Sequence, residues 1–317
     1  MDTFMIMLKN VLIFVLLAVP GYLLVRGKVL SGKESGTLSK LLTNIGMPFL
    51  IFSSALKLEF SGELTKNIII AGVLGVVFIL VMFFTTGFLC HDAKEKTRGM
   101  MRFCAIFANN GFIGIPLVAA VFGQASVVMA YMIILNILNN VLMFTLGVYL
   151  VSGDKKAMDV KKALLNPVLL AFIAGVALNL LGVNSILPEM QTYATHFSGI
   201  VTPLSMLVLG MKLADVPMKK LFTSGKMYYV SGLRLVLYPV LAVGMLLVVN
   251  MIPGLNLGTD GILAFFLAFA MPVAGLASAF ADHHQGDGEN AVILTLGTTV
   301  LSVLTIPALY WILRLFV

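Results

Sequence analysis

Long apolar runs recur along the whole chain and constrain its fold more than any other feature. Each run is about 20 residues long, which is the length of helix that crosses the hydrocarbon core of a bilayer. The 317 residues are 60% hydrophobic and 11% charged, whereas a soluble domain carries about 25% charged residues. A water-soluble fold could not cover so much apolar surface. We therefore expect an all-α integral membrane protein.

The apolar runs predict ten transmembrane helices. A transmembrane β-barrel needs alternating segments of roughly 10 residues, and these runs are longer and do not alternate. The first run has no small-residue cleavage site after it, so we expect it to be retained as a span. The predicted spans lie near residues 4–25, 38–56, 67–89, 100–122, 126–151, 163–182, 196–214, 226–249, 261–281 and 290–316.

Lysine and arginine are concentrated in alternate loops. Sixteen of the 21 lie around the loops after the first, third, fifth and seventh spans, whereas the loops after the even-numbered spans hold only Lys57 and Lys66. Cytoplasmic loops are enriched in these residues. The pattern predicts a multi-pass protein of the cell (plasma or inner) membrane with both termini outside the cytoplasm. Topology thus explains the net charge of +7, and we expect no nucleic-acid partner.

Three features recur in the two halves of the chain at nearly the same separation. The matched positions are Pro48 and Pro203, Pro116 and Pro272, and the triplets Asn136, Asn139, Asn140 and Thr295, Thr298, Thr299. Each half has five spans, an odd number, so the second half enters the membrane upside down. We expect two inverted five-helix repeats, 1–151 and 163–317, joined by a short cytoplasmic linker, 152–162. Inverted repeats are typical of secondary transporters.

The fourth and ninth spans are predicted to be broken. Pro116 removes a backbone donor and crowds the preceding turn, and Gly111 and Gly114 loosen the helix. Pro272 and Gly275 occupy the ninth span. A broken helix is tolerated in a membrane only inside protein or beside a water-filled cavity. Two breaks that cross at mid-membrane would offer helix N-termini to a carboxylate and helix C-terminal carbonyls to a cation.

Polar side chains near the breaks have two interpretations. Asn109, Asn110, Asn44 and the asparagine triplet either bind a neighbouring helix or face the substrate, and the threonines can also bond back to their own helix. The candidate substrate-binding residues are Asn109, Asn110, Gly111, Gly114, Pro116, Pro272, Gly275, Asn44, Asn136 and Asn140.

The remaining charged and titratable residues indicate no enzyme. Arg102 and Arg234 lie near the predicted cytoplasmic face, where long side chains can reach water; the other interpretation is direct contact with substrate. His283 and His284 are expected in a solvated loop. We find no catalytic or metal-binding motif, so we expect no catalytic residue, cofactor or metal site, and no residues are assigned to a coupling ion.

The segment Asn109–Pro116 resembles the auxin efflux carrier family, whose bacterial members include malonate and malate carriers. Asn44 and Pro48, Asn166-Pro167, and Met271-Pro272 resemble it as well, and the resemblance covers essentially the whole chain. It implies ten helices in two inverted repeats, divided into a scaffold and a transport domain. It also implies that the fourth and ninth helices cross at Pro116 and Pro272 with the substrate beside them, and that the protein is a homodimer like the plant carriers.

The short linker 152–162 departs from the plant members, which have a long central hydrophilic loop. A small carboxylate is therefore favoured over auxin. We predict a secondary transporter of a small organic anion, a mono- or dicarboxylate such as malonate or malate or an auxin-like acid, that works by alternating access. The alternatives are an ion channel and a sodium-coupled symporter of an apolar organic acid, similar to the bile-acid symporters. The residues do not distinguish a proton from sodium as coupling ion.

Overall fold

The computed structural model describes residues 3–31, 34–92, 94–158, 161, 164–183, 187 and 189–316, and the regular elements in that part of the chain are helices. The helices form two compact units, each of which draws on both halves of the sequence. Unit 1 is Met1–Lys66, Gly111–Ile133 and Leu165–Val216, and unit 2 is Asn67–Asn110, Ile134–Leu164 and Pro217–Val317.

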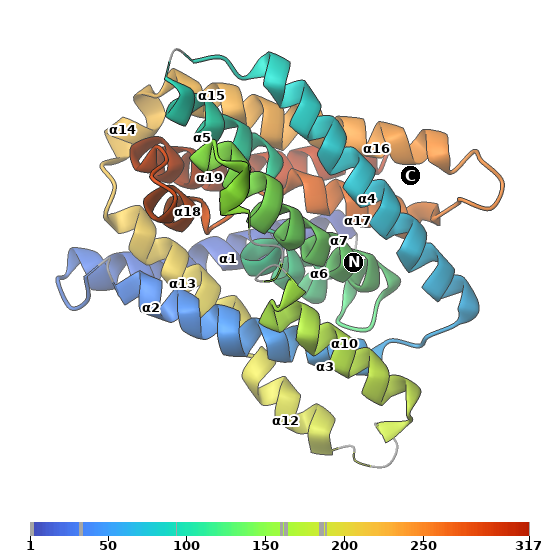
Figure 1. The fold of residues 1–317 in the computed structure, drawn as a ribbon. Helices are drawn as coiled ribbons and strands as arrows, with labels where there is room; N and C mark the ends of the chain where they lie inside the picture. The colour runs from blue at the N-terminus through green and yellow to red at the C-terminus, as the bar shows by residue number, and fades with distance from the viewer. Residues whose placement is uncertain are drawn as a thin grey trace. The chain divides into compact units, whose positions relative to one another are not determined.

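Unit 1 is built from helices that pair across the two halves of the sequence. Its helices are α1 (Thr3–Arg26), α2 (Glu34–Leu41), η1 (Leu42–Gly46), α3 (Met47–Lys57), α6 (Ile115–Phe122), the first part of α7 (Val127–Leu142), α10 (Pro167–Leu180), α12 (Glu189–Ser198) and α13 (Val201–Ala214). α1 packs against α13, and α3 packs against α10 and α12 (Figure 1).

Specific residues fix these pairings. α10 begins where the Asn166 side chain accepts a hydrogen bond from the Val168 N–H at 2.8 Å, with Pro167 at the first helical position. The Asn179 amide of α10 then donates to the Leu56 carbonyl at 2.8 Å, near the end of α3. In α13, Gly210 lies so close to the Ala18 carbonyl of α1 that a Cβ atom there would overlap it. Small residues allow this close approach of membrane helices.

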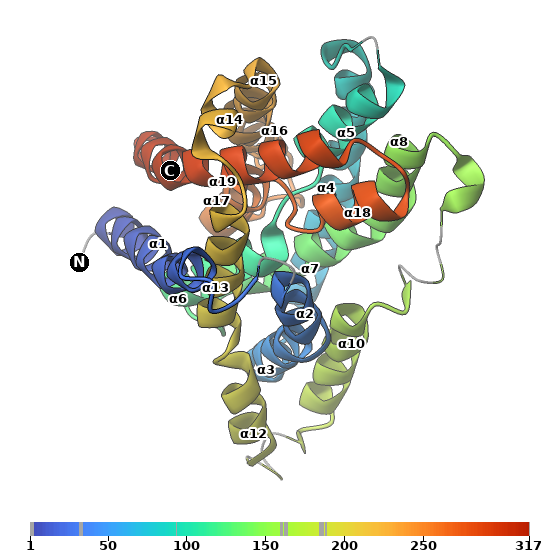
Figure 2. The ribbon, with the colours of Figure 1, turned by 90° about the vertical axis from the view of Figure 1, so that its left-hand side faces the viewer.

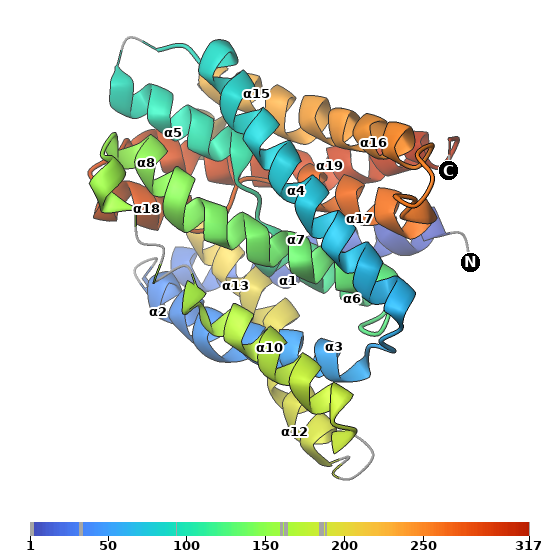
Figure 3. The same ribbon diagram turned by 45° about the vertical axis from the view of Figure 1, so that its right-hand side comes forward.

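Unit 2 contains the interrupted helices. Its elements are most of α4 (Gly62–Leu89), α5 (Glu95–Ile106), the second part of α7 (Val127–Leu142), η3 (Met143–Gly147), α8 (Val148–Ser152), η4 (Lys155–Ala157), α14 (Met218–Thr223), α15 (Gly225–Gly232), η5 (Leu233–Leu237), α16 (Tyr238–Val249), α17 (Gly258–Ala270), α18 (Ala277–His283) and α19 (Gly288–Leu313). α19 packs against α5, α15 and α18 (Figure 2). α17 packs against α16 (Figure 3). The π-helical turn η2 (Asn110–Gly114) begins at Asn110, the last residue of the segment Asn67–Asn110 of unit 2, and continues into α6.

Six helices of the described residues are long and apolar enough to cross a membrane. They are Phe4–Arg26, Gly62–Leu89, Val127–Ser152, Glu189–Ala214, Gly225–Val249 and Gly288–Leu313. Each coincides with a predicted span. Large apolar side chains on their outer surfaces are exposed, including Leu16 (67%), Phe88 (79%) and Leu304 (72%), as expected for helices that contact lipid. The all-helical membrane architecture is therefore confirmed.

The other four predicted spans contain shorter helices. α10 has 14 residues, and the second predicted span is a succession of α2, η1 and α3. The fourth is interrupted after α5, and the ninth after α17.

Candidate substrate site

The two interrupted helices of unit 2 meet at their interruptions. α5 ends at Ile106 and Phe107 is extended (φ −94°, ψ 124°), while α17 ends at Ala270 and Met271 is extended (φ −63°, ψ 145°). The Asn109 N–H donates to the Pro272 carbonyl at 2.8 Å. Together with a reciprocal bond from the Ala274 N–H to the Phe107 carbonyl, at 2.9 Å, this makes an antiparallel bridge. The bridge supplies hydrogen-bond partners to backbone N–H and C=O groups that the interruptions would otherwise leave without them.

Only one of the two predicted prolines lies at its interruption. Pro272 lies in the extended segment, where its carbonyl is used and no N–H is needed. Pro116 instead lies in the first turn of α6, directly after the π-helical turn η2, so the backbone is helical on both sides of it. The fourth span is therefore broken within Phe107–Pro116, as predicted, but at Phe107–Asn109 and not at Pro116, where the resemblance implied that the helices cross.

Side chains from two further helices hold the crossing backbone. In α7, Asn139 Oδ1 accepts from the Ala108 N–H and Asn139 Nδ2 donates to the Ala108 carbonyl, both at 3.2 Å. In α19, Thr298 Oγ1 accepts from the Val273 N–H at 3.1 Å and donates back to Leu294 of its own helix at 2.7 Å. Asn139 and Thr298 occupy matched positions of the two triplets. Neither residue was among the predicted site residues. The matched i, i+3, i+4 spacing of the two triplets is the feature of the sequence that indicates them.

Arg234 of the π-helical turn η5 is fully buried. We expected it to reach water at the cytoplasmic face, and that expectation is wrong. Its Nε donates to the Met271 carbonyl at 2.9 Å and its Nη1 to the Ile106 carbonyl at 2.9 Å. Both carbonyls lie where a helix ends, so no following turn supplies an N–H that could donate to them. The guanidinium therefore contacts the C-terminal ends of both interrupted helices.

Two predicted site residues carry polar atoms that are buried without a hydrogen-bond partner in the described structure. They are Oδ1 of Asn110, which is 3% exposed, and Nδ2 of Asn136, which is 1% exposed. Asn136 Oδ1 accepts from Asn140 at 3.4 Å. A buried polar atom without a partner costs about 1–3 kcal/mol, and a polar ligand would relieve that cost.

The other predicted residues are distributed between the two units. Gly275 lies in a turn after the ninth-span interruption. Gly111, Gly114 and Pro116 belong to unit 1 and carry no polar side chain. Asn44, also in unit 1, is exposed and donates to the Lys40 carbonyl of its own helix at 2.8 Å, which favours a structural role.

Arg102 makes its contacts on α4 and not at the crossing. Its Nη2 donates to the Phe83 carbonyl at 2.8 Å, and its guanidinium lies 4.9 Å from the centre of the Phe83 ring. Of the two histidines, His283 is exposed at the end of α18. No cluster of three or more residues suited to a metal ion occurs among the described residues.

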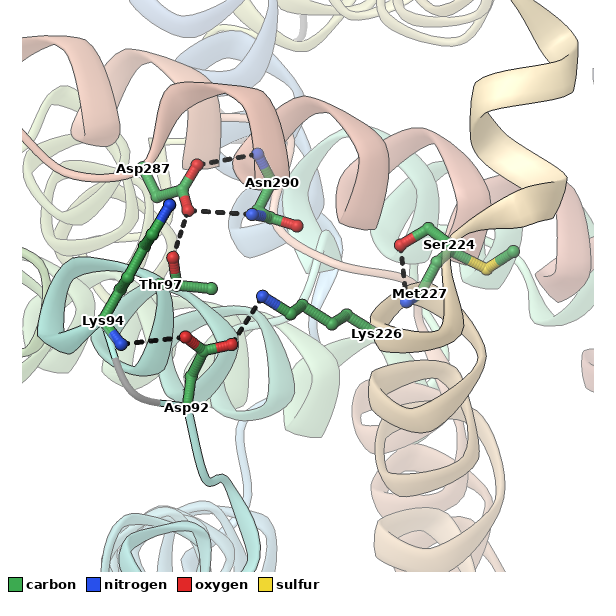
Figure 4. Close-up of polar contacts among 8 residues, drawn as sticks. All are labelled: Asp92, Lys94, Thr97, Ser224, Lys226, Met227, Asp287 and Asn290. Carbon is green, nitrogen blue, oxygen red and sulfur yellow. Dashed lines mark hydrogen bonds and ion pairs between the residues drawn. The ribbon is translucent and has the colours of Figure 1, made fainter.

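A separate polar network ties the starts of three helices of unit 2 together (Figure 4). Lys226 pairs with Asp92 at 2.5 Å, and Thr97 donates to Asp287, whose carboxylate caps α19 by accepting from the Asn290 N–H at 3.1 Å. Burial raises the pKa of Asp287, but the hydrogen bonds from Thr97 and Asn290 outweigh it and leave the pKa below its ordinary value. The hydrogen bond from Lys226 lowers the pKa of Asp92.

Comparison with known proteins identifies the class. A family model described as "membrane transport protein" matches residues 6–310. An uncharacterized transporter of Methanothermobacter thermautotrophicus is 30% identical over 311 residues, which is 94% of each chain. The uncharacterized transporter YfdV of Escherichia coli is 24% identical over 308 residues, which is 90% of this chain and 92% of YfdV.

The family match and the apolar helices together define a multi-pass membrane transport protein. The chain belongs to the auxin efflux carrier family, as the segment Asn109–Pro116 predicted. This is a family of transporters and not a class of enzymes, so a small-molecule substrate and the bilayer are its partners.

Proposed function

We propose that this protein is a secondary carrier that binds a small organic anion at the crossing of the interrupted helices and moves it by alternating access. The observation that carries the proposal is the pair of unpartnered buried atoms, Asn110 Oδ1 and Asn136 Nδ2. An amide N–H such as that of Asn136 donates to a carboxylate oxygen, which every candidate acid supplies, and Asn110 Oδ1 accepts from a ligand donor such as the malate hydroxyl, which ionised malonate lacks.

The anion is a mono- or dicarboxylate such as malonate or malate, or an auxin-like acid. Arg234 is buried and pairs with no carboxylate of the described residues, which supports a negatively charged ligand. The crossing atoms are buried, so the ligand reaches them only when the backbone around the crossing moves. That requirement agrees with a carrier that alternates between closed and open forms, and not with a continuously open pore.

We further propose that the fold has ten spans in two inverted repeats, 1–151 and 163–317, with both termini outside the cytoplasm. The matched supports favour the repeat: Asn139 holds Ala108 in one half, and Thr298 holds Val273 in the other. The helix pairs agree with it too. α1 of the first span packs against α13 of the seventh, and α3 of the second span packs against α10 of the sixth, so each repeat's first span meets the other repeat's second span. In this proposal the carrier lies in the cell membrane as a homodimer.

Equilibrium binding to purified protein tests the proposal. Malonate, malate and indole-3-acetate are compared with their uncharged amides by thermal shift in detergent at neutral pH. We expect at least one acid to raise the unfolding temperature and its amide to have little effect, since a ligand stabilises only the state it binds. Asn136→Ala should lose the acid-induced shift, and Asn10→Ala should keep it, because Asn10 lies on α1 in unit 1, where its amide donates to the Ile6 carbonyl of the same helix. Amides that stabilise as well as the acids would contradict the proposal.

A further inference from the structure

Arg234 is the buried charged group of the crossing, and the proposed function uses its charge only as support for an anionic substrate. It makes hydrogen bonds to four backbone carbonyls, and none of the ion pairs among the described residues includes it. The acceptors and their distances are Met271 and Ile106 at 2.9 Å, Ala268 at 3.2 Å and Ala105 at 3.5 Å.

The four acceptors belong to the ends of two helices. Ala105 and Ile106 close α5, Ala268 lies in the last turn of α17, and Met271 follows that helix directly. Carbonyls at a helix C-terminus carry the negative end of the helix dipole and attract a cation. In transporters with broken helices, such carbonyls can coordinate a coupling ion. Here the guanidinium occupies them.

We propose that Arg234 is a built-in cation that takes the place of a coupling metal ion at the crossing and gives the site its preference for anions. This inference rests on the proposed function, because it names the charge that selects the substrate of that site. It assigns Arg234 a positioning and specificity role through backbone carbonyls and no direct contact with the ligand.

The charge of Arg234 acts on the same short stretch of backbone as the candidate ligand groups. Arg234 holds Ile106, and two residues later Asn139 holds Ala108. Asn136, with its unpartnered amide, lies one turn from Asn139 on α7. A ligand at Asn136 therefore lies near a positive charge that no carboxylate of the described residues pairs with. In a buried environment such a charge discriminates strongly between an anion and a neutral analogue.

A sodium ion at the same carbonyls is disfavoured for two reasons. The carbonyl oxygens already accept charge-assisted hydrogen bonds. A second cation would also be repelled by the guanidinium at short range. We therefore expect substrate binding that is independent of sodium.

The first test needs no variant. Malonate binding to the purified full-length protein is measured in sodium chloride and in choline chloride at equal ionic strength. We expect dissociation constants that agree within about twofold, and an affinity about tenfold or more higher in sodium would overturn the proposal.

Two variants then separate charge from structure. Arg234→Lys keeps the charge, whereas Arg234→Met has similar length and none. We expect Arg234→Lys to keep part of the malonate affinity and Arg234→Met to lose about tenfold or more, with binding of neutral malonamide unchanged in both. A purely structural role would weaken both ligands equally and would overturn the proposal. Arg102→Met is the control and should bind malonate like wild type, because Arg102 contacts α4 at Phe83.

A ligand-free measurement separates this inference from the proposed function. If wild type binds none of the carboxylate probes, the proposed function fails and Arg234 is tested by thermal unfolding alone. Exchange of choline for sodium should leave the wild-type unfolding temperature unchanged and raise that of Arg234→Ala, in which the carbonyls are open to the ion. A rise in wild type, or none in Arg234→Ala, contradicts the inference. Should the neutral variants fail to fold, the wild-type sodium comparison and Arg234→Lys decide.

Discussion

The side-chain amide of Asn139 pairs at both of its ends with the backbone of Ala108. The carboxamide oxygen accepts from the N–H, and the carboxamide nitrogen donates to the carbonyl, at 3.2 Å each. Ala108 is the residue that bridges to Val273 where the two interrupted helices meet. One buried side chain thus replaces the hydrogen bonds that a continuous helix would have supplied at this point.

Removal of this pair should destabilise the protein measurably. Asn139→Ala leaves two buried backbone groups without partners, so we expect a loss of about 1–3 kcal/mol in the free energy of unfolding. Asn139→Asp should cost more, because a second acceptor then faces the Ala108 carbonyl. Asn140→Ala is the control on the same helix, since its contact to Asn136 is long at 3.4 Å. Unfolding midpoints in detergent measure the difference. An Asn139→Ala protein as stable as wild type would show that the hydrogen bonds of Asn139 to Ala108 do not stabilise the crossing.

Two glycine substitutions should have opposite effects. In Gly210→Ala the new Cβ atom meets the Ala18 backbone, which cannot move cheaply, so we expect a loss of about 1–3 kcal/mol. In Gly232→Ala nothing lies within 4 Å of the new atom, and the better helix propensity of alanine should stabilise by up to about 1 kcal/mol. Thermal unfolding of the two variants side by side checks the sign. Equal effects would show that α1 and α13 do not pack through Gly210.

Acid should weaken the network around Asp287. The pKa of Asp287 is below its ordinary value of 3.8 in the folded protein, so this carboxylate stabilises the fold above the ordinary pKa. That contribution should be lost as the pH falls through the lower folded value. We expect wild-type stability to decline below about pH 4 more steeply than that of Asp287→Asn, in which the titrating group is absent. Parallel pH profiles of the two proteins would exclude this role for Asp287.

Most of the helical architecture could be predicted from sequence, because run length and the cost of unsatisfied backbone in lipid leave few alternatives. The position of the fourth-span interruption could not. No residue of Phe107–Asn109 forbids a helix, and the segment is extended because it pairs with Pro272 and Ala274, which are distant in sequence. Pro116 does not mark the interruption, because the backbone is helical before it, in η2, and after it, in α6.

The site could be predicted only in part for the same reason. Asn110 and Asn136 stand out in the sequence because they are polar residues in apolar spans. The sequence does not show which of their side-chain atoms lack hydrogen-bond partners. Arg234 stands out in the sequence as the only lysine or arginine between Lys226 and Arg314, but its position near a predicted span end favoured contact with water. Its acceptors come from two other helices, and no local pattern contains that information.

Topology mapping tests the ten-span proposal independently of any ligand. Reporter fusions should place the C-terminus outside the cytoplasm and an insertion after Lys156 inside it, because the basic residues collect in alternate loops. A fusion at Ser61, in the loop with few basic residues, is the matched outside control. A cytoplasmic C-terminus would contradict both the ten spans and the inverted repeat.

Uptake into proteoliposomes tests the central claim most directly. Purified wild type, Asn136→Ala and Asn10→Ala are reconstituted, and entry of radiolabelled malonate, malate and indole-3-acetate is followed against neutral malonamide, with current recorded in planar bilayers. We predict saturable uptake of at least one carboxylate by wild type and Asn10→Ala, its loss in Asn136→Ala, and no unitary currents. Flux that does not saturate, unitary currents, or malonamide entry as fast as that of the acids would contradict a carrier with an anion site at the crossing.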